Sequence, residues 1–160
     1  QGEVVSAVNF NSPGQVVIAG AKAAVERAIE GCKARGAKRA LPLPVSVPSH
    51  CELMRPAAER FAESIAAINW QAPQIPLVQN VSAAVAADLD TLKRDLLEQL
   101  YKPVRWVESV QTLAANGATE LVECGPGKVL AGLNKRCADG VSTANLNTPE
   151  AFAAARAALA

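Results

Sequence analysis

Strand-like and helix-like segments alternate along this chain, and this alternation restricts the fold more than any other feature of the sequence. Short apolar runs bounded by turn residues give way to segments whose apolar residues recur at helical spacing. Because parallel strands need a crossover connection, usually a helix, such alternation is typical of a parallel sheet flanked by helices. We therefore predict an α/β fold, in one domain or one domain plus a small subdomain, for the 160 residues.

The first 46 residues predict a β-β-α-β unit. Ser12-Pro13-Gly14 is a turn signal between two apolar runs, and Gly36 follows an amphipathic segment as a typical residue just after a helix. Prolines cannot donate a ladder hydrogen bond, so the third strand is expected at an edge or at an exit from the sheet. The expected elements are strands at 4–11 and 15–19, a helix at 21–35 and a third strand at 37–45.

The remainder of the chain continues the alternation. The expected elements are helices at 53–68, 92–101 and 104–116, strands at 75–81 and 118–124, a helix through 136, a strand at 142–146 and a last helix from 149. Gly125-Pro126-Gly127 before a helix is open to two interpretations, a phosphate site at the helix N-terminus or a tight strand-to-helix turn. The lack of the P-loop spacing, together with the missing donor at Pro126, favours the turn.

His50 is the only histidine of the chain, and its neighbours suggest a special position. Pro48 keeps the preceding residue extended, and Ser49 and Glu52 have the spacing of a capping box. We predict that Ser49 caps a helix and that His50 lies in its first turn, where the helix dipole disfavours imidazolium. A neutral imidazole can accept a proton from a hydroxyl or thiol. Local features alone favour the simpler interpretation, an ordinary partly buried histidine near a helix start.

Composition excludes several classes of function. The net charge of +1 gives no electrostatic case for nucleic acid or an anionic membrane surface. There is no apolar run of the roughly 20 residues that a membrane helix needs, and no basic-then-apolar N-terminus typical of a signal peptide. The cysteines form no C-x-x-C pair, so we expect no metal and reduced thiols in a cytoplasmic protein. They are Cys32, Cys51, Cys124 and Cys137.

Four segments, in order along nearly the whole chain, resemble the family of malonyl-CoA:acyl carrier protein transacylases, and most closely the free-standing bacterial form of type II fatty acid synthesis. They are residues 9–20 (NFNSPGQVVIAG), 47–54 (VPSHCELM), 99–106 (QLYKPVRW) and 123–130 (ECGPGKVL). The resemblance implies part of an acyltransferase α/β-hydrolase-like parallel sheet plus an incomplete ferredoxin-like small subdomain. It places the partial subdomain at 1–46 and the C-terminal part of the large domain at 47–160.

The resemblance also implies a mechanism, the transfer of a malonyl group from coenzyme A to the phosphopantetheine thiol of acyl carrier protein through a serine acyl-enzyme. His50 matches the base that activates the serine and later protonates the leaving thiol. Gln99 matches the residue whose backbone carbonyl orients the histidine, a role that a serine–histidine pair requires. No metal or cofactor is implied, and malonyl-CoA is the substrate. The positions that match the substrate cleft are Asn11, Gln15, Ser49 and Asn80.

Several parts of the family pattern are missing. The chain contains no G-H-S-x-G serine motif, no G-Q-G-x-Q loop and no match for the arginine that pairs with the malonyl carboxylate. The resemblance therefore covers a C-terminal half, which supplies the histidine but not the nucleophile. Because a base without its nucleophile has little activity, we predict that the chain alone is inactive and that the N-terminal half with the serine is a partner.

Two alternatives remain open at this stage. A non-catalytic module of the same fold would bind acyl carrier protein through basic residues, which would otherwise be ordinary solvated side chains; these are Lys102, Arg105, Lys128, Lys135 and Arg136. A thiol enzyme would use Cys51 beside His50. Neighbouring residues on a helix point about 100° apart, so a shared proton is disfavoured and Cys51 is better explained as a small core residue. For Asn11, Gln15 and Asn80, the alternative is a polar side chain that satisfies nearby backbone groups.

Overall fold

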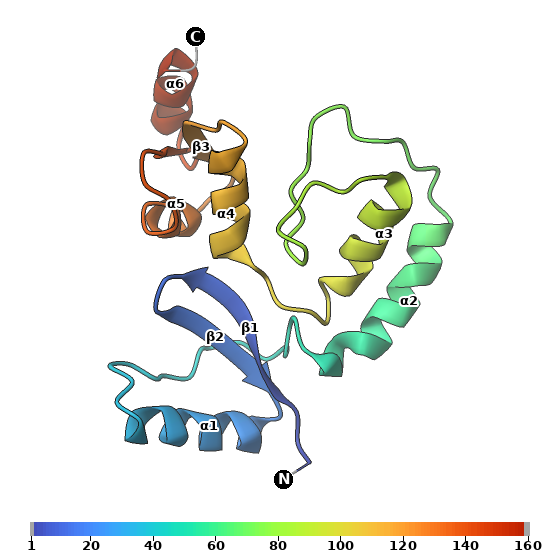
Figure 1. The fold of residues 1–160 in the computed structure, drawn as a ribbon, viewed down its shortest axis with the longest axis vertical. Helices are drawn as coiled ribbons and strands as arrows, with labels where there is room; N and C mark the ends of the chain where they lie inside the picture. Colours follow the sequence, from blue (N-terminus) through green and yellow to red (C-terminus); the bar gives the residue numbers. More distant parts are fainter. Residues whose placement is uncertain (1, 159–160) are drawn as a thin grey trace.

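The structure is a computed structural model that describes residues 2–158 (Figure 1). Its elements, in chain order, are β1 (Val5–Ser12), β2 (Gln15–Gly20), α1 (Lys22–Ala34), the 3-10 helix η1 (Glu52–Met54), α2 (Arg55–Ala66), α3 (Leu89–Glu98), α4 (Trp106–Ala115), β3 (Glu120–Glu123), α5 (Val129–Asn134), β4 (Ser142–Asn145) and α6 (Pro149–Ala158). The described chain contains both strands and helices, but η1, α2, α3 and α4 follow one another without a strand, so the predicted alternation holds only in the first and last parts.

The first elements form an antiparallel hairpin with a helix beside it. β1 and β2 pair from Val5 opposite Gly20 to Ser12 opposite Gln15, and Gly14 takes the positive φ of 76° that the turn between them requires. Gly20 lies where β2 gives way to α1, and a Cβ atom there would lie only 2.1 Å from the carbonyl oxygen of Val4. Glycine is therefore required for the close passage of the two backbone segments.

Two predicted strands do not form. The segment 37–45 has no strand, and 75–81 contains only an isolated bridge between Val78 and Val85. Prolines explain both corrections, because Pro42 and Pro44 in the first segment and Pro76 in the second each remove a backbone donor from a short run. The proposed division of the chain at residue 46 stays a prediction.

The second sheet of the described chain is a parallel pair. β3 and β4 run in register from Glu120 opposite Ser142 to Glu123 opposite Asn145, and α5 lies in the connection between them. This is the β-α-β arrangement predicted for this region. In Figure 1 it lies above the hairpin, while α2 and α3 pack against each other on the other side of the molecule.

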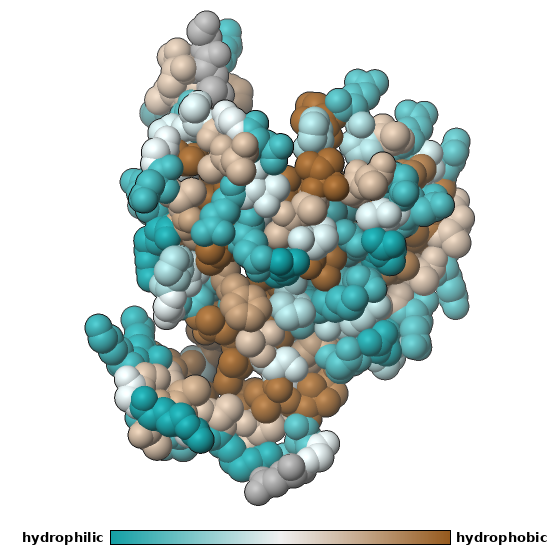
Figure 2. All heavy atoms as spheres, viewed as in Figure 1, coloured by the Kyte–Doolittle hydropathy of each residue, from teal (hydrophilic) through white to brown (hydrophobic). Residues whose placement is uncertain are grey.

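The hydrophobic core is small and divided between these parts. Val8 of β1, Cys51 and Val110 of α4 are its most enclosed side chains. The space-filling view shows hydrophobic residues also at the surface, between the hairpin and the helices above it (Figure 2). An unusual number of large apolar side chains are thus only partly covered.

Ile65 of α2 offers a test of this core. Its side chain is 4% exposed, whereas Ile68, just beyond the same helix, is 53% exposed. We expect Ile65→Ala to lower the free energy of unfolding by about 2–4 kcal/mol, because it removes buried methyl groups and leaves a cavity. Ile68→Ala should change it by less than about 0.5 kcal/mol. Urea denaturation followed by circular dichroism checks both, and equal losses would contradict the burial of Ile65.

Candidate functional site

His50 lies just before a helix and not inside one. Its backbone has φ 64°, in the left-handed region that a residue with a side chain rarely adopts, at a cost of about 1–3 kcal/mol. The following helix begins with η1 at Glu52, and Cys51 is its N-cap residue. The predicted position of His50 in the first helical turn is therefore wrong.

The predicted capping box also fails, and the reason is visible in the side chains. Glu52 turns toward Arg55, which donates to it from Nε at 2.7 Å and from Nη2 at 2.8 Å. The backbone N–H of Ser49 donates instead to the carbonyl of Val47 at 2.9 Å. The Arg55 guanidinium holds the pKa of the Glu52 carboxyl below its usual range, chiefly through this hydrogen bond.

The imidazole of His50 is held by the end of α3. Nδ1 lies 2.5 Å from the backbone carbonyl oxygen of Gln99, and the backbone N–H of His50 donates to the carbonyl of Leu100 at 2.9 Å. Because a carbonyl can only accept, Nδ1 must carry the proton in this contact. The other ring nitrogen, Nε2, is then the one that can accept a proton.

The segment 99–105 connects the parts of the molecule that surround His50. Beyond the two contacts to His50, Val104 exchanges backbone hydrogen bonds with β1, donating to Val8 at 2.8 Å and accepting from Phe10 at 3.0 Å. The N–H of Arg105 donates to the carbonyl of Asn80 at 2.9 Å. The hairpin, the residues before α3 and the histidine are therefore all attached to one strip of backbone.

Asn80 belongs to the same cluster. Its Nδ2 donates to Oε1 of Gln99 at 3.3 Å, and both side chains are partly buried. The structure thus brings together His50, Gln99 and Asn80, three of the residues that the sequence singled out. Ser49 is exposed next to His50 in the chain.

Asn11 and Gln15 form a second group at the tip of the hairpin. Gln15 Oε1 accepts from Ser12 Oγ at 3.3 Å and from Arg136 Nη1 at 3.1 Å, and the Asn11 carbonyl faces the Cys137 thiol at 3.5 Å. No hydrogen bond within residues 2–158 joins Asn11 or Gln15 to the His50 cluster. The Gln15 side chain contacts two other side chains, and Asn11 makes its contact through its backbone carbonyl, so neither the cleft role nor the backbone-satisfying alternative is decided for them.

Two further residues belong to the cluster: Leu100, which the sequence did not indicate, and Arg105, which it indicated only as a carrier-binding candidate. Leu100 holds the backbone of His50 through its carbonyl, and Arg105 holds the loop that carries Asn80, with Nη1 donating to the Ser82 carbonyl at 2.9 Å. No sequence signal marks Leu100, since any residue has a carbonyl. Arg105 lies in the same family block, 99–106, as Gln99, and this shared block was a usable signal.

Cys51 does not pair with the histidine. Its thiol donates to the carbonyl of Pro48 at 3.2 Å, and the side chain is 1% exposed. This is a small core residue, and the contact disfavours a thiol enzyme built on Cys51.

The four cysteines predict a clear order of chemical reactivity. Cys32 and Cys124 are exposed, whereas Cys51 and Cys137 are buried. Burial raises the pKa of the Cys137 thiol, and the charge of Arg136 opposes this only in part. We expect iodoacetamide at pH 8 to label Cys32 and Cys124 at least about tenfold faster than the buried pair, because the thiolate is the reactive form. Peptide mass spectrometry over time checks the order, and all four should react alike in denaturant.

The turn after β3 is closed by a side chain rather than left open for an anion. Glu123 Oε2 accepts from the N–H of Ala131 in the first turn of α5 at 2.8 Å. A carboxylate thus occupies the place that a phosphate would need, which agrees with the tight strand-to-helix turn predicted for 125–127.

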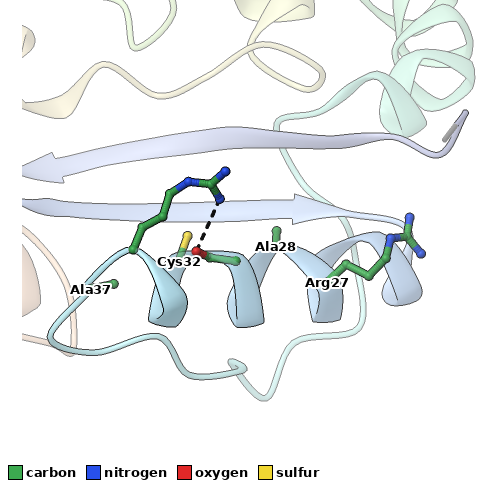
Figure 3. Close-up of a pocket in the computed structure, with 7 residues that line it drawn as sticks. Arg27, Ala28, Cys32 and Ala37 are labelled. Atoms are coloured by element: carbon green, nitrogen blue, oxygen red, sulfur yellow. Dashed lines mark hydrogen bonds between the residues drawn. The ribbon is translucent and has the colours of Figure 1, made fainter.

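The described residues contain hollows away from His50. One of about 600 Å³ lies along α1 and its C-terminal end, lined by residues that include Arg27, Ala28, Cys32 and Ala37 (Figure 3). It is open, and none of the His50 cluster lines it.

Residues 2–158 hold no group of three or more His, Cys, Asp or Glu placed to bind a metal. No helix of this described part is long and apolar enough to cross a membrane.

Comparison with known proteins defines the class to which this fold and site belong. The family described as "Acyl transferase domain" matches residues 1–152, and this chain belongs to that family. The resemblance predicted from the four segments is confirmed, as is the acyltransferase α/β fold class.

The individual relatives are more specific. The malonyl CoA-acyl carrier protein transacylase of Escherichia coli (strain K12) is 57% identical over 155 residues, which are 97% of this chain and 50% of that protein. The one of Bacillus subtilis (strain 168) is 46% identical over 150 residues, 94% of this chain and 47% of that protein. This chain spans about half the length of the curated relatives that it matches.

Solved structures agree. The crystal structure of malonyl-CoA:acyl carrier protein transacylase from Xanthomonas oryzae pv. oryzae KACC10331 superposes with a TM-score of 0.94 at 50% identity, covering 98% of this chain and 50% of that one. A structure described as a type II PKS acyl-carrier protein in complex with its malonyl-transacylase gives a TM-score of 0.93 at 52% identity, with coverage of 97% and 50%. These matches share the fold of nearly this whole chain with about half of each solved chain.

Proposed function

We propose that this chain supplies the histidine base for transfer of a malonyl group from malonyl-CoA to the phosphopantetheine thiol of acyl carrier protein. The contact between His50 Nδ1 and the Gln99 carbonyl, at 2.5 Å, is the observation that carries the proposal. It directs the proton to Nδ1 and leaves Nε2 to take the proton of a serine hydroxyl and later to return it to the leaving thiol. A backbone carbonyl orients the base without adding a second charge to the site.

The serine is proposed to come from a polypeptide segment that carries the G-H-S-x-G motif, which this sequence lacks. The chain alone should then be inactive. We place Asn11, Gln15 and Ser49 on the side of the cleft that receives the substrate, in accordance with the family resemblance. Malonyl-CoA is the acyl donor, no cofactor takes part, and a cytoplasmic location fits four cysteines without a disulfide among the described residues.

The surface supports a second polypeptide as partner. Residues 41–47 are all exposed, and the four large apolar residues that alternate along this segment have exposed fractions between 54% and 73%. These side chains are Leu41, Leu43, Val45 and Val47. Further exposed apolar residues follow at Leu53, Ile75 and Leu77. We propose that the serine-bearing segment covers the apolar side chains of residues 41–47, because exposed apolar patches typically mark interaction sites.

The alternative of a non-catalytic carrier-binding module has weaker support. Three of its five basic residues are engaged inside the chain: Lys102 with Glu98, Arg105 with Glu108, and Arg136 with Gln15. A module that only binds the carrier would not need the contact between His50 Nδ1 and the Gln99 carbonyl. Charge reversal at Lys128 and Lys135 would weaken carrier binding if the alternative held.

The proposal is tested by reconstitution. This chain is co-expressed with the half of the E. coli relative that lies outside the matched region, so that the two can fold together. Intact-mass spectrometry after brief exposure to malonyl-CoA should show one malonyl group on the serine-bearing polypeptide and none on this chain. Subsequent addition of acyl carrier protein should remove it. An assembled pair that never becomes malonylated would overturn the proposed function.

A further inference from the structure

Asn80 is connected to His50 through two successive contacts that both involve Gln99. Asn80 Nδ2 donates to the side-chain Oε1 of Gln99 at 3.3 Å, and the backbone oxygen of Gln99 faces His50 Nδ1 at 2.5 Å. The side chain of Gln99 therefore contacts one residue and its backbone the other. A substitution of the Gln99 side chain can therefore remove the contact to Asn80 and keep the backbone contact to His50.

The loop that carries Asn80, residues 79–84, is firmly closed. Its two ends exchange backbone contacts, from Gln79 N–H to the Ala84 carbonyl at 2.9 Å and from Ala83 N–H to the Gln79 carbonyl at 2.8 Å. Two helices hold it from outside: Gln79 Nε2 donates to the Leu92 carbonyl of α3 at 3.2 Å, and Thr112 Oγ1 of α4 donates to the Ala83 carbonyl at 2.7 Å. Asn80 is thus presented from a rigid loop.

Gln99 lies at the end of a helix, where the hydrogen bond from Asn80 to its side chain can influence the orientation of its backbone. It is the C-cap residue of α3, and the last carbonyls of a helix have no partner inside it. The orientation of the Gln99 peptide group determines whether its carbonyl oxygen is aligned to accept the hydrogen bond from His50 Nδ1. Its side chain is the part of residue 99 that an outside group can hold.

We propose that Asn80 is a positioning residue, which fixes the tautomer and orientation of His50 by holding the side chain of Gln99. The inference rests on the proposed role of His50 as base and adds a residue to that site. It differs from a substrate-contacting role for Asn80, because the amide N–H₂ is directed at Gln99. The relevant quantity is the ratio of the Nδ1–H to the Nε2–H form of the neutral imidazole.

The single histidine makes this ratio directly measurable. In the ¹⁵N-labelled chain, long-range ¹H–¹⁵N correlation spectra contain one imidazole, so the two nitrogen shifts report His50 alone. We expect mainly the Nδ1–H form in the parent chain. Asn80→Ala should lower the ratio about two- to tenfold, as expected for the loss of one net hydrogen bond. Asn69→Ala, at an exposed position after α2, is the matched control and should leave it unchanged.

Gln99→Ala completes a double-mutant cycle. It keeps the backbone oxygen that accepts from His50 and removes only the tethered side chain, so it should lower the ratio as much as Asn80→Ala does. The double variant should add nothing further, because both changes remove the same link. An unchanged ratio in either single variant, or additive effects in the double variant, would overturn the proposal. Since no malonyl transfer is measured, failure of the proposed function would be seen separately, in the reconstitution.

Discussion

Replacing His50 with alanine should lower malonyl transfer by the reconstituted pair about 10⁴- to 10⁶-fold, the range found when a member of a serine–histidine catalytic unit is removed. The imidazole is the only histidine side chain of this chain, and its Nε2 is left to accept while Nδ1 is held at the Gln99 carbonyl. Without it the serine hydroxyl keeps its proton and attacks the thioester poorly. The rate is measured as malonyl groups appearing on acyl carrier protein, by mass spectrometry.

Two controls separate this effect from a damaged fold. Asn69→Ala, exposed and outside the cluster, should retain the parent rate. Cys51→Ala should stay within about tenfold, because the thiol is buried against the Pro48 carbonyl and takes no part in proton transfer. A His50→Ala pair that assembles and still transfers malonyl groups within tenfold of the parent would show that another group is the base.

The sequence predicted the regular elements well where one local signal dominated. The hairpin at 5–20, the helix at 22–34 and the parallel pair around 120–145 each follow from a turn, a helical period or a βαβ pattern. The two predicted strands that do not form, at 37–45 and 75–81, contain Pro42 and Pro44 in the first and Pro76 in the second. A strand also forms only if a partner strand supplies the hydrogen-bond ladder. The alternation of apolar residues therefore indicated which side chains favour burial, but it did not indicate which part of the structure would bury them.

Three of the residues singled out from the sequence lie together in the structure, whereas the local geometry predicted around His50 does not form. His50 and Gln99, which belong to two of the family blocks, come together with Asn80, which belongs to none of them, yet the local argument for a capping box at Ser49 was wrong. Glu52 had two partners available, and the charged Arg55 forms the stronger hydrogen bonds. His50 has a left-handed backbone, and its N–H donates to the Leu100 carbonyl, a contact 50 residues away in sequence that no local pattern encodes.

Val45→Asp is expected to weaken association with the serine-bearing polypeptide by roughly 10²- to 10³-fold. Val45 is 73% exposed in this chain, in the middle of the apolar segment 41–47. If the partner covers this segment, a carboxylate there must lose its water without gaining a countercharge, which costs several kcal/mol. Titration calorimetry or co-purification of the two polypeptides measures the loss.

The same substitution should leave the chain itself intact, because an exposed side chain contributes little to its stability. The free energy of unfolding should change by less than about 0.5 kcal/mol. Val129→Asp is the matched control: Val129 is 70% exposed, lies far from the 41–47 segment in sequence, and occupies the first position of α5, where the helix dipole favours a carboxylate. We expect it to bind the partner like the parent.

The pattern of the two variants decides what covers the apolar segment. Weakened association for Val45→Asp alone places the partner on this surface. Equal weakening by both variants would point to a general effect of negative charge, and unchanged association in Val45→Asp would show that the partner binds elsewhere. If the parent chain instead pairs with itself and Val45→Asp makes it monomeric in sedimentation experiments, a second copy covers the segment, and the base and the serine must then meet across a different surface.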